Sequence, residues 1–208
     1  MTRIVGFHLV VPPTVFHPRY FLSTKIFAKF ISSLNLQGCH VADLGTGTGI
    51  LGLAAASAGA ASVLAIDINP SAACVAIDNA RANGFANRFT ALCCNLFSSV
   101  VEGCLFDAVL TNPPYLAREP KDVADRACAA GIQYRDIRSL FKEAAKRLKP
   151  SGAVYIILSQ HSDRDTLASF IQEAGLRIAH IQERSAFIER LFIYELRHER
   201  ELELPARQ

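Results

Sequence analysis

Asp43-Leu44-Gly45-Thr46-Gly47-Thr48-Gly49 is the stretch that decides the fold. It ends the apolar run 39–44, which predicts a buried strand, and it opens the alanine-rich run 48–58, which predicts a helix. Glycines between a strand and a helix permit positive φ angles and let the backbone approach a bound ligand. The stretch therefore predicts a ligand-binding turn at the carboxyl end of a strand in an α/β sheet.

From residue 39 onward, patterns typical of strands and helices alternate along the chain. Strands are predicted at 39–44, 62–67, 89–94, 105–111 and 152–159, and helices at 48–58, 71–83, 134–148 and 163–174. Two further strands, at 176–182 and 189–196, predict a hairpin at the sheet edge. The fold class predicted is α/β: a doubly wound, Rossmann-like sheet, mostly parallel, with an antiparallel C-terminal edge hairpin.

The 208 residues fit a single domain with three parts. Residues 1–37 predict a strand at 4–11 and a helix over about 24–36, capped by Ser23, that together cover the ligand site. Residues 38–197 form the ligand-binding catalytic part, and residues 198–208, in which charges alternate with leucine, predict a flexible tail.

Composition bounds the class of protein. Half of the residues are hydrophobic, and the net charge of +3, without a dense basic run, gives little support for a nucleic-acid partner. The six cysteines show no zinc-binding spacing, so we predict no metal site, buried free thiols and a reducing, cytoplasmic compartment. The apolar stretch 4–11 is too short to span a membrane, so no membrane partner is expected.

The glycine spacing and two acidic residues favour one class of ligand. A dinucleotide fingerprint reads GxGxxG, whereas here Ile50 stands at the third glycine position. Asp43, two residues before the first glycine, suits a ligand with a cationic amino group better than a pyrophosphate. S-adenosylmethionine (SAM) carries an ammonium and a sulfonium. Asp67 ends the second predicted strand, where a carboxylate accepts hydrogen bonds from ribose hydroxyls of either kind of cofactor.

Asn112-Pro113-Pro114-Tyr115 follows the predicted strand 105–111. Prolines cannot extend a sheet ladder, so this stretch predicts a rigid loop at the strand end. An amide side chain and a backbone carbonyl in such a loop can together orient a planar NH2 group.

Taken together, the stretch 43–49, Asp67, Asn95-Leu96-Phe97 and Thr111-Asn112-Pro113-Pro114-Tyr115 resemble the HemK-type SAM-dependent N-methyltransferases, which have the class I SAM-methyltransferase fold. The resemblance implies SAM as cofactor, with contacts from Asp43, Gly45, Thr46, Gly47, Gly49, Asp67, Ile68, Asn95, Leu96 and Asn112. It also implies catalytic roles for three residues: Asn112 and the Pro113 carbonyl accept hydrogen bonds from the acceptor NH2, and Tyr115 packs against it. The segment 15–24 would close over the cofactor. The chain departs from the family at Asn95, where an Asp is common, and in 19–22, where acidic residues are frequent.

The motifs leave the substrate open. The short segment before the first helix favours a protein glutamine side chain of the release-factor type, a reaction that some family members carry out with a small partner subunit. The alternatives are an adenine N6 of tRNA or rRNA, a small-molecule amine or amide, and a non-catalytic SAM-binding scaffold. The charged stretch 116–133 predicts a mobile loop over the substrate, in which Glu119, Lys121, Asp122 and Arg126 are solvated rather than catalytic.

Overall fold

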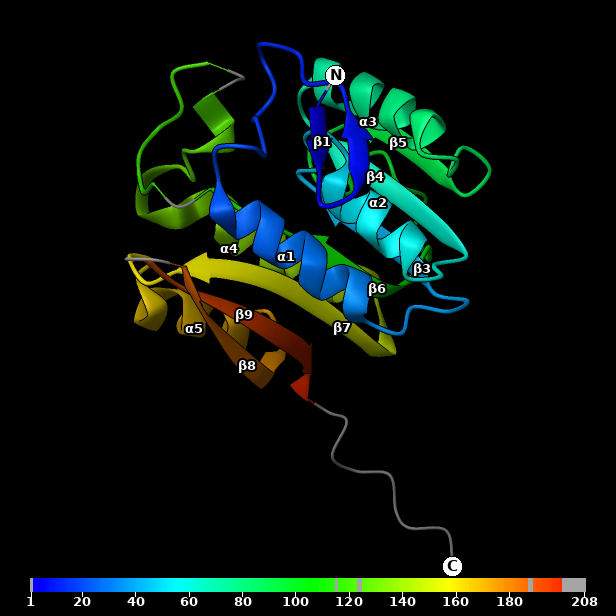
Figure 1. Cartoon of the computed structure of the whole chain (residues 1–208). Coiled ribbons are helices and arrows are strands. Elements are labelled where there is room, and N and C mark those ends of the chain that lie inside the picture. Colours follow the sequence, from blue (N-terminus) through cyan, green and yellow to red (C-terminus); the bar gives the residue numbers. More distant parts are fainter. Residues whose placement is uncertain (1, 115, 123–124, 187–188, 200–208) are drawn as a thin grey trace, which may run out of the picture.

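The computed structural model describes residues 2–114, 116–122, 125–186 and 189–199 (Figure 1). Seven strands form one sheet in the order β5-β4-β3-β6-β7-β9-β8. Their bounds are β3 (His40–Leu44), β4 (Ser62–Asp67), β5 (Phe89–Cys93), β6 (Phe106–Thr111), β7 (Leu148–Ser159), β8 (Leu176–Ala186) and β9 (Glu189–His198). Neighbouring strands from β5 to β7 pair in parallel, and β9 runs antiparallel to both β7 and β8. The predicted doubly wound sheet with an antiparallel edge hairpin is confirmed.

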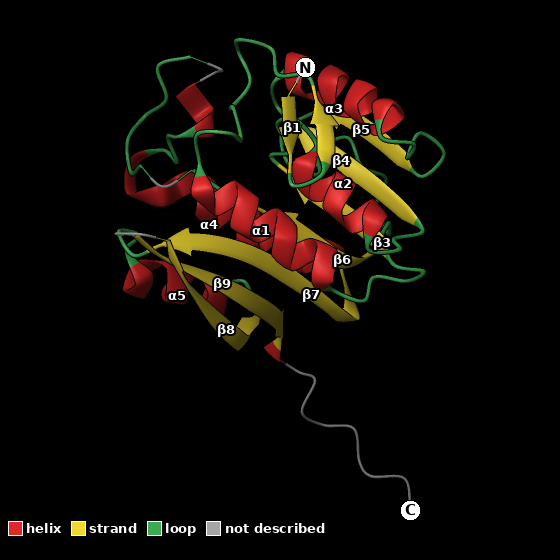
Figure 2. Cartoon of the chain, in the orientation of Figure 1, coloured by secondary structure: helices red, strands yellow, loops and turns green. Residues whose placement is uncertain are grey.

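Helices cover both faces of this sheet (Figure 2). They are α1 (Leu22–Ser33), α2 (Ile50–Ser57), α3 (Pro70–Ala82), α4 (Arg135–Arg147) and α5 (Arg164–Glu173), with short 3-10 turns at Asp125–Ala127 and Ile132–Tyr134. Side chains of α1 and α2 pack in one core, and those of α4 and α5 pack in the other. Leu110 of β6 belongs to the first core and Val109 to the second, because successive strand residues point to opposite faces. Burial on both faces explains the continuous apolar runs of the central strands.

The N-terminal prediction is wrong in two details. Instead of one strand over 4–11, β1 (Thr2–Ile4) and β2 (Phe7–Leu9) form an antiparallel hairpin around Val5 and Gly6. Val5 has a φ of 51°, which β-branched residues rarely adopt, so the turn has a weak sequence signal. Ser23 does not cap α1: it lies inside the first turn, and Phe21 stands at the cap position without a side-chain hydrogen bond.

Other element boundaries differ by a few residues. Helix α1 ends at Ser33 rather than 36, and β7 begins at Leu148 rather than 152. Strand β9 extends to His198, and residues 200–208 of the predicted tail lie outside the described residues.

The predicted burial of the cysteines is also wrong. Cys74, Cys93 and Cys104 are exposed, and the other three are half-buried, although all six are free thiols. Among the described residues, no helix has both the length and the apolar character that crossing a membrane requires.

Candidate cofactor and acceptor site

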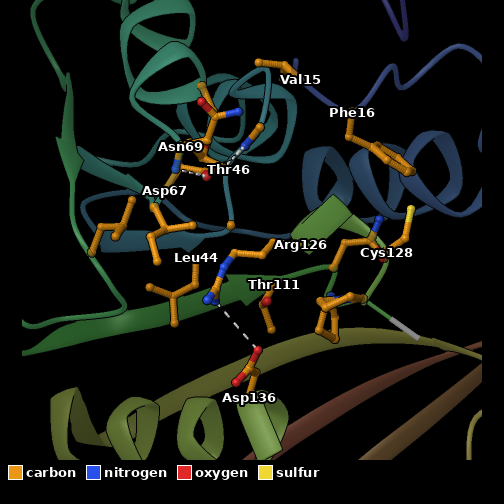
Figure 3. Close-up of a pocket in the computed structure, with 18 of the residues that line it drawn as sticks. Val15, Phe16, Leu44, Thr46, Asp67, Asn69, Thr111, Arg126, Cys128 and Asp136 are labelled. Carbon is orange, nitrogen blue, oxygen red and sulfur yellow. Dashed lines mark hydrogen bonds and ion pairs between the residues drawn. The ribbon is translucent and has the colours of Figure 1, made fainter. Parts of the chain in front are cut away.

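A cavity of about 490 Å³ opens at the carboxyl ends of β3, β4 and β6 (Figure 3). Leu44 of β3 pairs in register with Ile66 of β4 on one side and with Thr111 of β6 on the other, and all three line this cavity. The chain runs outward from β3 to β4 and β5 and then returns to β6, so the cavity lies where the strand order reverses. Its volume is within the range of about 300–1,000 Å³ that is usual for ligand pockets.

The glycine stretch forms a tight loop against β4. Gly45, Gly47 and Gly49 have φ angles of 69°, 55° and 83°. The amides of Gly45 and Thr46 both donate to the Ile66 carbonyl, at 2.9 and 3.0 Å. A Cβ added at Gly49 would lie 3.1 Å from the Cβ of Ala76, so this glycine is required by the close approach of α3. The loop has the conformation that the sequence predicted.

Asp43, in β3 just before the loop, stabilises it through hydrogen bonds. Its side chain is fully buried, and its Oδ2 accepts hydrogen bonds from the Thr46 hydroxyl at 2.6 Å and from the Gly52 amide at 2.9 Å. Burial raises the pKa of Asp43 to about 6, against the opposing effect of these two hydrogen bonds. Of the described residues predicted to contact the cofactor, Asp43 and Gly49 are absent from the cavity wall. The structure shows a structural role for Asp43 in holding the loop, and its direct contact with a cationic group of the cofactor stays a prediction.

Asp67 lies in the cavity wall, as the sequence predicted. Its Oδ2 accepts from the Gly47 amide and its Oδ1 from the Asn69 amide, both at 2.9 Å. Burial raises the pKa of Asp67, and the hydrogen bonds from Asn69 and Gly47 oppose this shift. Each carboxylate oxygen has a second lone pair, so this side chain can still accept bonds from two hydroxyl groups.

The far end of the cavity is partly apolar. Ile68, Asn95 and Leu96 line it, and Leu96 has a φ of 49°, which turns the chain sharply after β5. The wall thus presents a glycine loop for close approach, a carboxylate for hydroxyls, and apolar side chains with one amide for a planar base. These groups fit SAM.

Thr111, Asn112, Pro113 and Pro114, at the end of β6, form another part of the cavity wall. The Asn112 Nδ2 donates to the Thr24 hydroxyl at 3.1 Å, which joins this loop to the buried first turn of α1. Tyr115 lies outside the described residues, so its predicted packing against the acceptor stays a prediction.

The segment before α1 supplies part of the wall. Thr14, Val15, Phe16, Pro18 and Phe21 line the cavity. The rings of Phe16 and Phe21 stack with their centroids 3.9 Å apart.

The sequence named no site residue beyond Tyr115, although it predicted that 116–133 forms a loop over the substrate. Arg126, Cys128 and the α4 residues Asp136, Ile137, Ser139 and Leu140 also line the cavity. The Arg126 guanidinium lies 3.9 Å from the Asp136 carboxylate, and Figure 3 shows this ion pair in the cavity. The Arg126 side chain is 40% exposed, in line with the predicted solvation, and it also forms part of the cavity wall, which the sequence did not signal. The amphipathic pattern of α4 signals that Ile137 and Leu140 are buried, but not that they reach the site.

The model of the ribosomal protein L11 methyltransferase (PrmA) family matches residues 21–188. The chain belongs to the PrmA family. The match includes the glycine loop, Asp67 and the Asn112 loop, and the protein is accordingly a SAM-dependent methyltransferase. The motifs predicted a HemK-type enzyme; the cofactor and the reaction class are confirmed, while the HemK-type assignment stays a prediction.

Curated relatives of this PrmA-family chain are named for different substrates. The ribosomal protein L11 methyltransferase of Methylococcus capsulatus is 30% identical over 156 residues, which are 75% of this chain but only 45% of that protein. A protein of Methanocaldococcus jannaschii, described as a putative protein N5-glutamine methyltransferase, is 28% identical over 85% of this chain and 88% of its own length. The tRNA1(Val) (adenine(37)-N6)-methyltransferase of Shewanella halifaxensis is 28% identical over 70% of this chain and 60% of its own.

A solved structure agrees with the fold. The T. thermophilus 16S rRNA N2 G1207 methyltransferase, in complex with AdoMet and guanosine, superposes with a TM-score of 0.68 at 19% identity, over 93% of this chain and 49% of that chain. This likeness confirms the class I SAM-methyltransferase fold.

Proposed function

We propose that this PrmA-family enzyme transfers a methyl group to a planar NH2 nitrogen, and that its substrate is a glutamine side chain in a protein of the release-factor type. One observation carries the proposal: Asn112, Pro113 and Pro114 line the same cavity as the glycine loop and Asp67. An acceptor nitrogen held by Asn112 and Pro113 would therefore lie in the same cavity as a cofactor held by the glycine loop and Asp67.

The chemistry requires orientation more than a strong base. The lone pair of an amide nitrogen is delocalised, so the nitrogen is a weak nucleophile, and bound SAM supplies an electrophilic methyl group. The Asn112 Oδ1 and the Pro113 carbonyl would accept one hydrogen bond each from the NH2, which fixes its direction of attack and favours the positive charge that develops there. The hydrogen bond from the Asn112 Nδ2 to Thr24 restrains this amide.

The charges beside the acceptor loop support a protein substrate. Arg118 pairs with Asp125, Arg135 with Glu119 at 2.9 Å, and Arg126 with Asp136 at 3.9 Å. Nucleic-acid binding depends on cations that neutralise phosphates. Three arginines already paired with carboxylates, in a chain of net charge +3, offer little of this attraction.

The relatives support the same substrate class. The family name refers to a ribosomal protein, and the M. jannaschii relative, aligned over most of its length, is described as a protein glutamine enzyme. Release factors and ribosomal proteins act in the cytoplasm, so we propose that location for the enzyme. We also propose that the enzyme acts together with a small partner subunit.

An RNA adenine N6 is the second candidate. The stacked rings of Phe16 and Phe21 in the cavity wall would suit a base flipped out of its stack, and the S. halifaxensis relative acts on a tRNA adenine.

Transfer of labelled methyl from SAM tests the choice. The purified enzyme is incubated separately with release factors, ribosomal proteins, tRNA and rRNA, and labelled protein is digested to locate the modified residue. We expect label on a glutamine. Label confined to RNA would overturn the protein proposal in favour of the second candidate. Label on an amine group of a protein would overturn the proposal that the acceptor is a planar NH2 nitrogen.

A further inference from the structure

Residues 8–16, which we call the strap, run along α3 and end over the glycine loop. Three asparagine side chains, from α3 and the residues flanking it, hold the backbone of the strap. Asn83 pairs with both backbone groups of His8, at 2.9 and 2.7 Å, and Asn79 pairs with both of Val10, at 2.8 and 3.0 Å. Asn69 donates to the Thr14 carbonyl at 2.9 Å. The three amides fix successive points of one continuous segment.

Asn79 differs from the other two because it also contacts the glycine loop. Its side chain is fully buried, and its Nδ2 donates to the Thr48 carbonyl at 2.9 Å as well as to Val10. Both amide hydrogens and the amide oxygen are therefore engaged. One side chain joins the strap to the loop that lines the cofactor cavity.

The strap places residues directly over that loop. Thr14, Val15 and Phe16 line the cavity, and the Val15 Cγ1 lies 3.9 Å from the position that a Cβ on Gly47 would take. Val15 is buried. A shift of the strap relative to the loop would change the shape of the cavity at this contact.

We propose that Asn79 is a positioning residue for SAM binding. By fixing the strap and the glycine loop relative to each other, it forms this part of the cavity before the cofactor arrives. Ordering a mobile segment on binding costs free energy, so a preformed wall increases affinity. Asn79 itself does not line the cavity and acts through Val10 and Thr48.

The test is SAM affinity, measured by calorimetry on the purified full chain. In Asn79→Ala the strap loses its link to the glycine loop, and we expect the Kd for SAM to rise about tenfold because binding must then order the strap. Asn83→Ala is the matched control: it removes a side-chain amide of the same kind from the residue that follows α3, where the strap is bound but the glycine loop is not. Its Kd should stay within about twofold of wild type, since ordering near His8 is remote from the cavity.

A double-mutant cycle separates positioning from general loss of stability. Val15→Ala should weaken SAM binding in the wild-type background and much less in Asn79→Ala, because Val15 depends on Asn79 for its place. Additive losses, or a wild-type Kd in Asn79→Ala, would overturn the proposal. If Asn79→Ala does not fold, Asn79→Ser gives the same comparison. Hydrogen exchange without SAM adds an independent readout: the amides of Val11, Thr14, Val15 and Phe16 should exchange faster in the Asn79 variant than in Asn83→Ala, and equal rates would overturn the proposal.

Discussion

The two sides of the cavity are held by different kinds of interaction. The cofactor wall, residues 14–16, 44–48 and 66–69, is fixed by buried carboxylates and amides that bind backbone groups, such as Asp43 on Gly52 and Asn79 on Thr48. The proposed acceptor wall, residues 111–114 and the described residues of 116–140, also contains several ion pairs between partly or largely exposed side chains. In the pair of Arg135 and Glu119, the side chains are 58% and 47% exposed.

This difference has an energetic consequence. A buried hydrogen bond is expensive to break because the groups left behind lack water, whereas exposed ion pairs are worth about 0–1 kcal/mol. The cofactor wall is therefore built to keep one shape for one ligand. The acceptor wall can rearrange at low cost, which suits a site that must admit part of a macromolecule.

The largest effect is expected for a change at Asn112, which follows the end of β6 in the proposed acceptor wall. Asn112→Ala should lower turnover about 10²–10³-fold, because it removes a hydrogen-bond acceptor aimed at developing charge. The Kd for SAM should change little. Steady-state rates and calorimetry measure the two quantities, with Asn35→Ala, an asparagine outside the cavity wall, as the control. Unchanged turnover would refute the catalytic role.

The pH dependence of stability tests the burial of the cofactor wall. Because burial raises the pKa of Asp43 from 3.8 to about 6, the folded protein holds this proton more tightly than the unfolded chain does. The contribution of Asp43 to the free energy of unfolding is thus fully present below about pH 4 and is lost as the pH rises through about 6, a change of roughly 3 kcal/mol. Asp43→Asn keeps an oxygen for Thr46 and Gly52 without the charge, so it should gain stability relative to wild type over this range.

Urea unfolding at several pH values measures the difference between the two proteins. Asp163 is the control, because hydrogen bonds from Thr166 lower the pKa of its carboxylate. Its contribution has the opposite sign, being present above the unfolded pKa and lost as the pH falls, so Asp163→Asn should lose stability relative to wild type as the pH rises from about 3 to 5. Parallel curves for Asp43→Asn and wild type would contradict the buried, raised pKa.

Asp67→Ala tests the cofactor wall by ligand affinity. The change removes the acceptor for the amides of Gly47 and Asn69 and for ribose hydroxyls, so the Kd for SAM should rise about 10–100-fold, as expected for one or two lost charged hydrogen bonds. Turnover at saturating SAM should fall less than in Asn112→Ala. The control is Asp78→Ala, an exposed acid of α3. Equal loss of SAM affinity in the Asp67 and Asn112 variants would contradict the division between the two walls.

The smallest expected effect is that of salt, which should speed amide exchange in the acceptor wall and leave exchange in the cofactor wall unchanged. Raising the salt from about 0.1 M to about 1 M shortens the Debye length from about 10 Å to about 3 Å. Exposed pairs such as Arg135 with Glu119 then weaken, so amide exchange in 116–122 and 125–134 should become a few-fold faster. The amides of Gly47 and Gly52, which donate to the half-buried Asp67 and the buried Asp43, should be unaffected. Equal acceleration of amide exchange at both walls would contradict the proposed difference in the interactions that hold them.

Much of the fold and part of the site could be predicted from local patterns. The glycine loop is visible because few residues other than glycine adopt its positive φ angles, and the Asn112 loop is visible because proline cannot continue a strand. Asp67 and Asn95 were located because strand ends in a parallel sheet meet at one edge. The turn at Val5 was missed because its residue type opposes its conformation.

What the sequence by itself determined is the order of strands and helices, the cofactor and the kind of nitrogen that we propose as acceptor, since each depends on a short run of residues. The tertiary structure alone decided how distant segments share the site. The bond from Asn79 to Val10 spans 69 residues and that from Asn112 to Thr24 spans 88. It also turned Asp43 inward and brought Arg126 into the cavity. The physical reason is that a side chain's partner and burial depend on how packed elements meet in space, and a local pattern fixes only the element to which that side chain belongs.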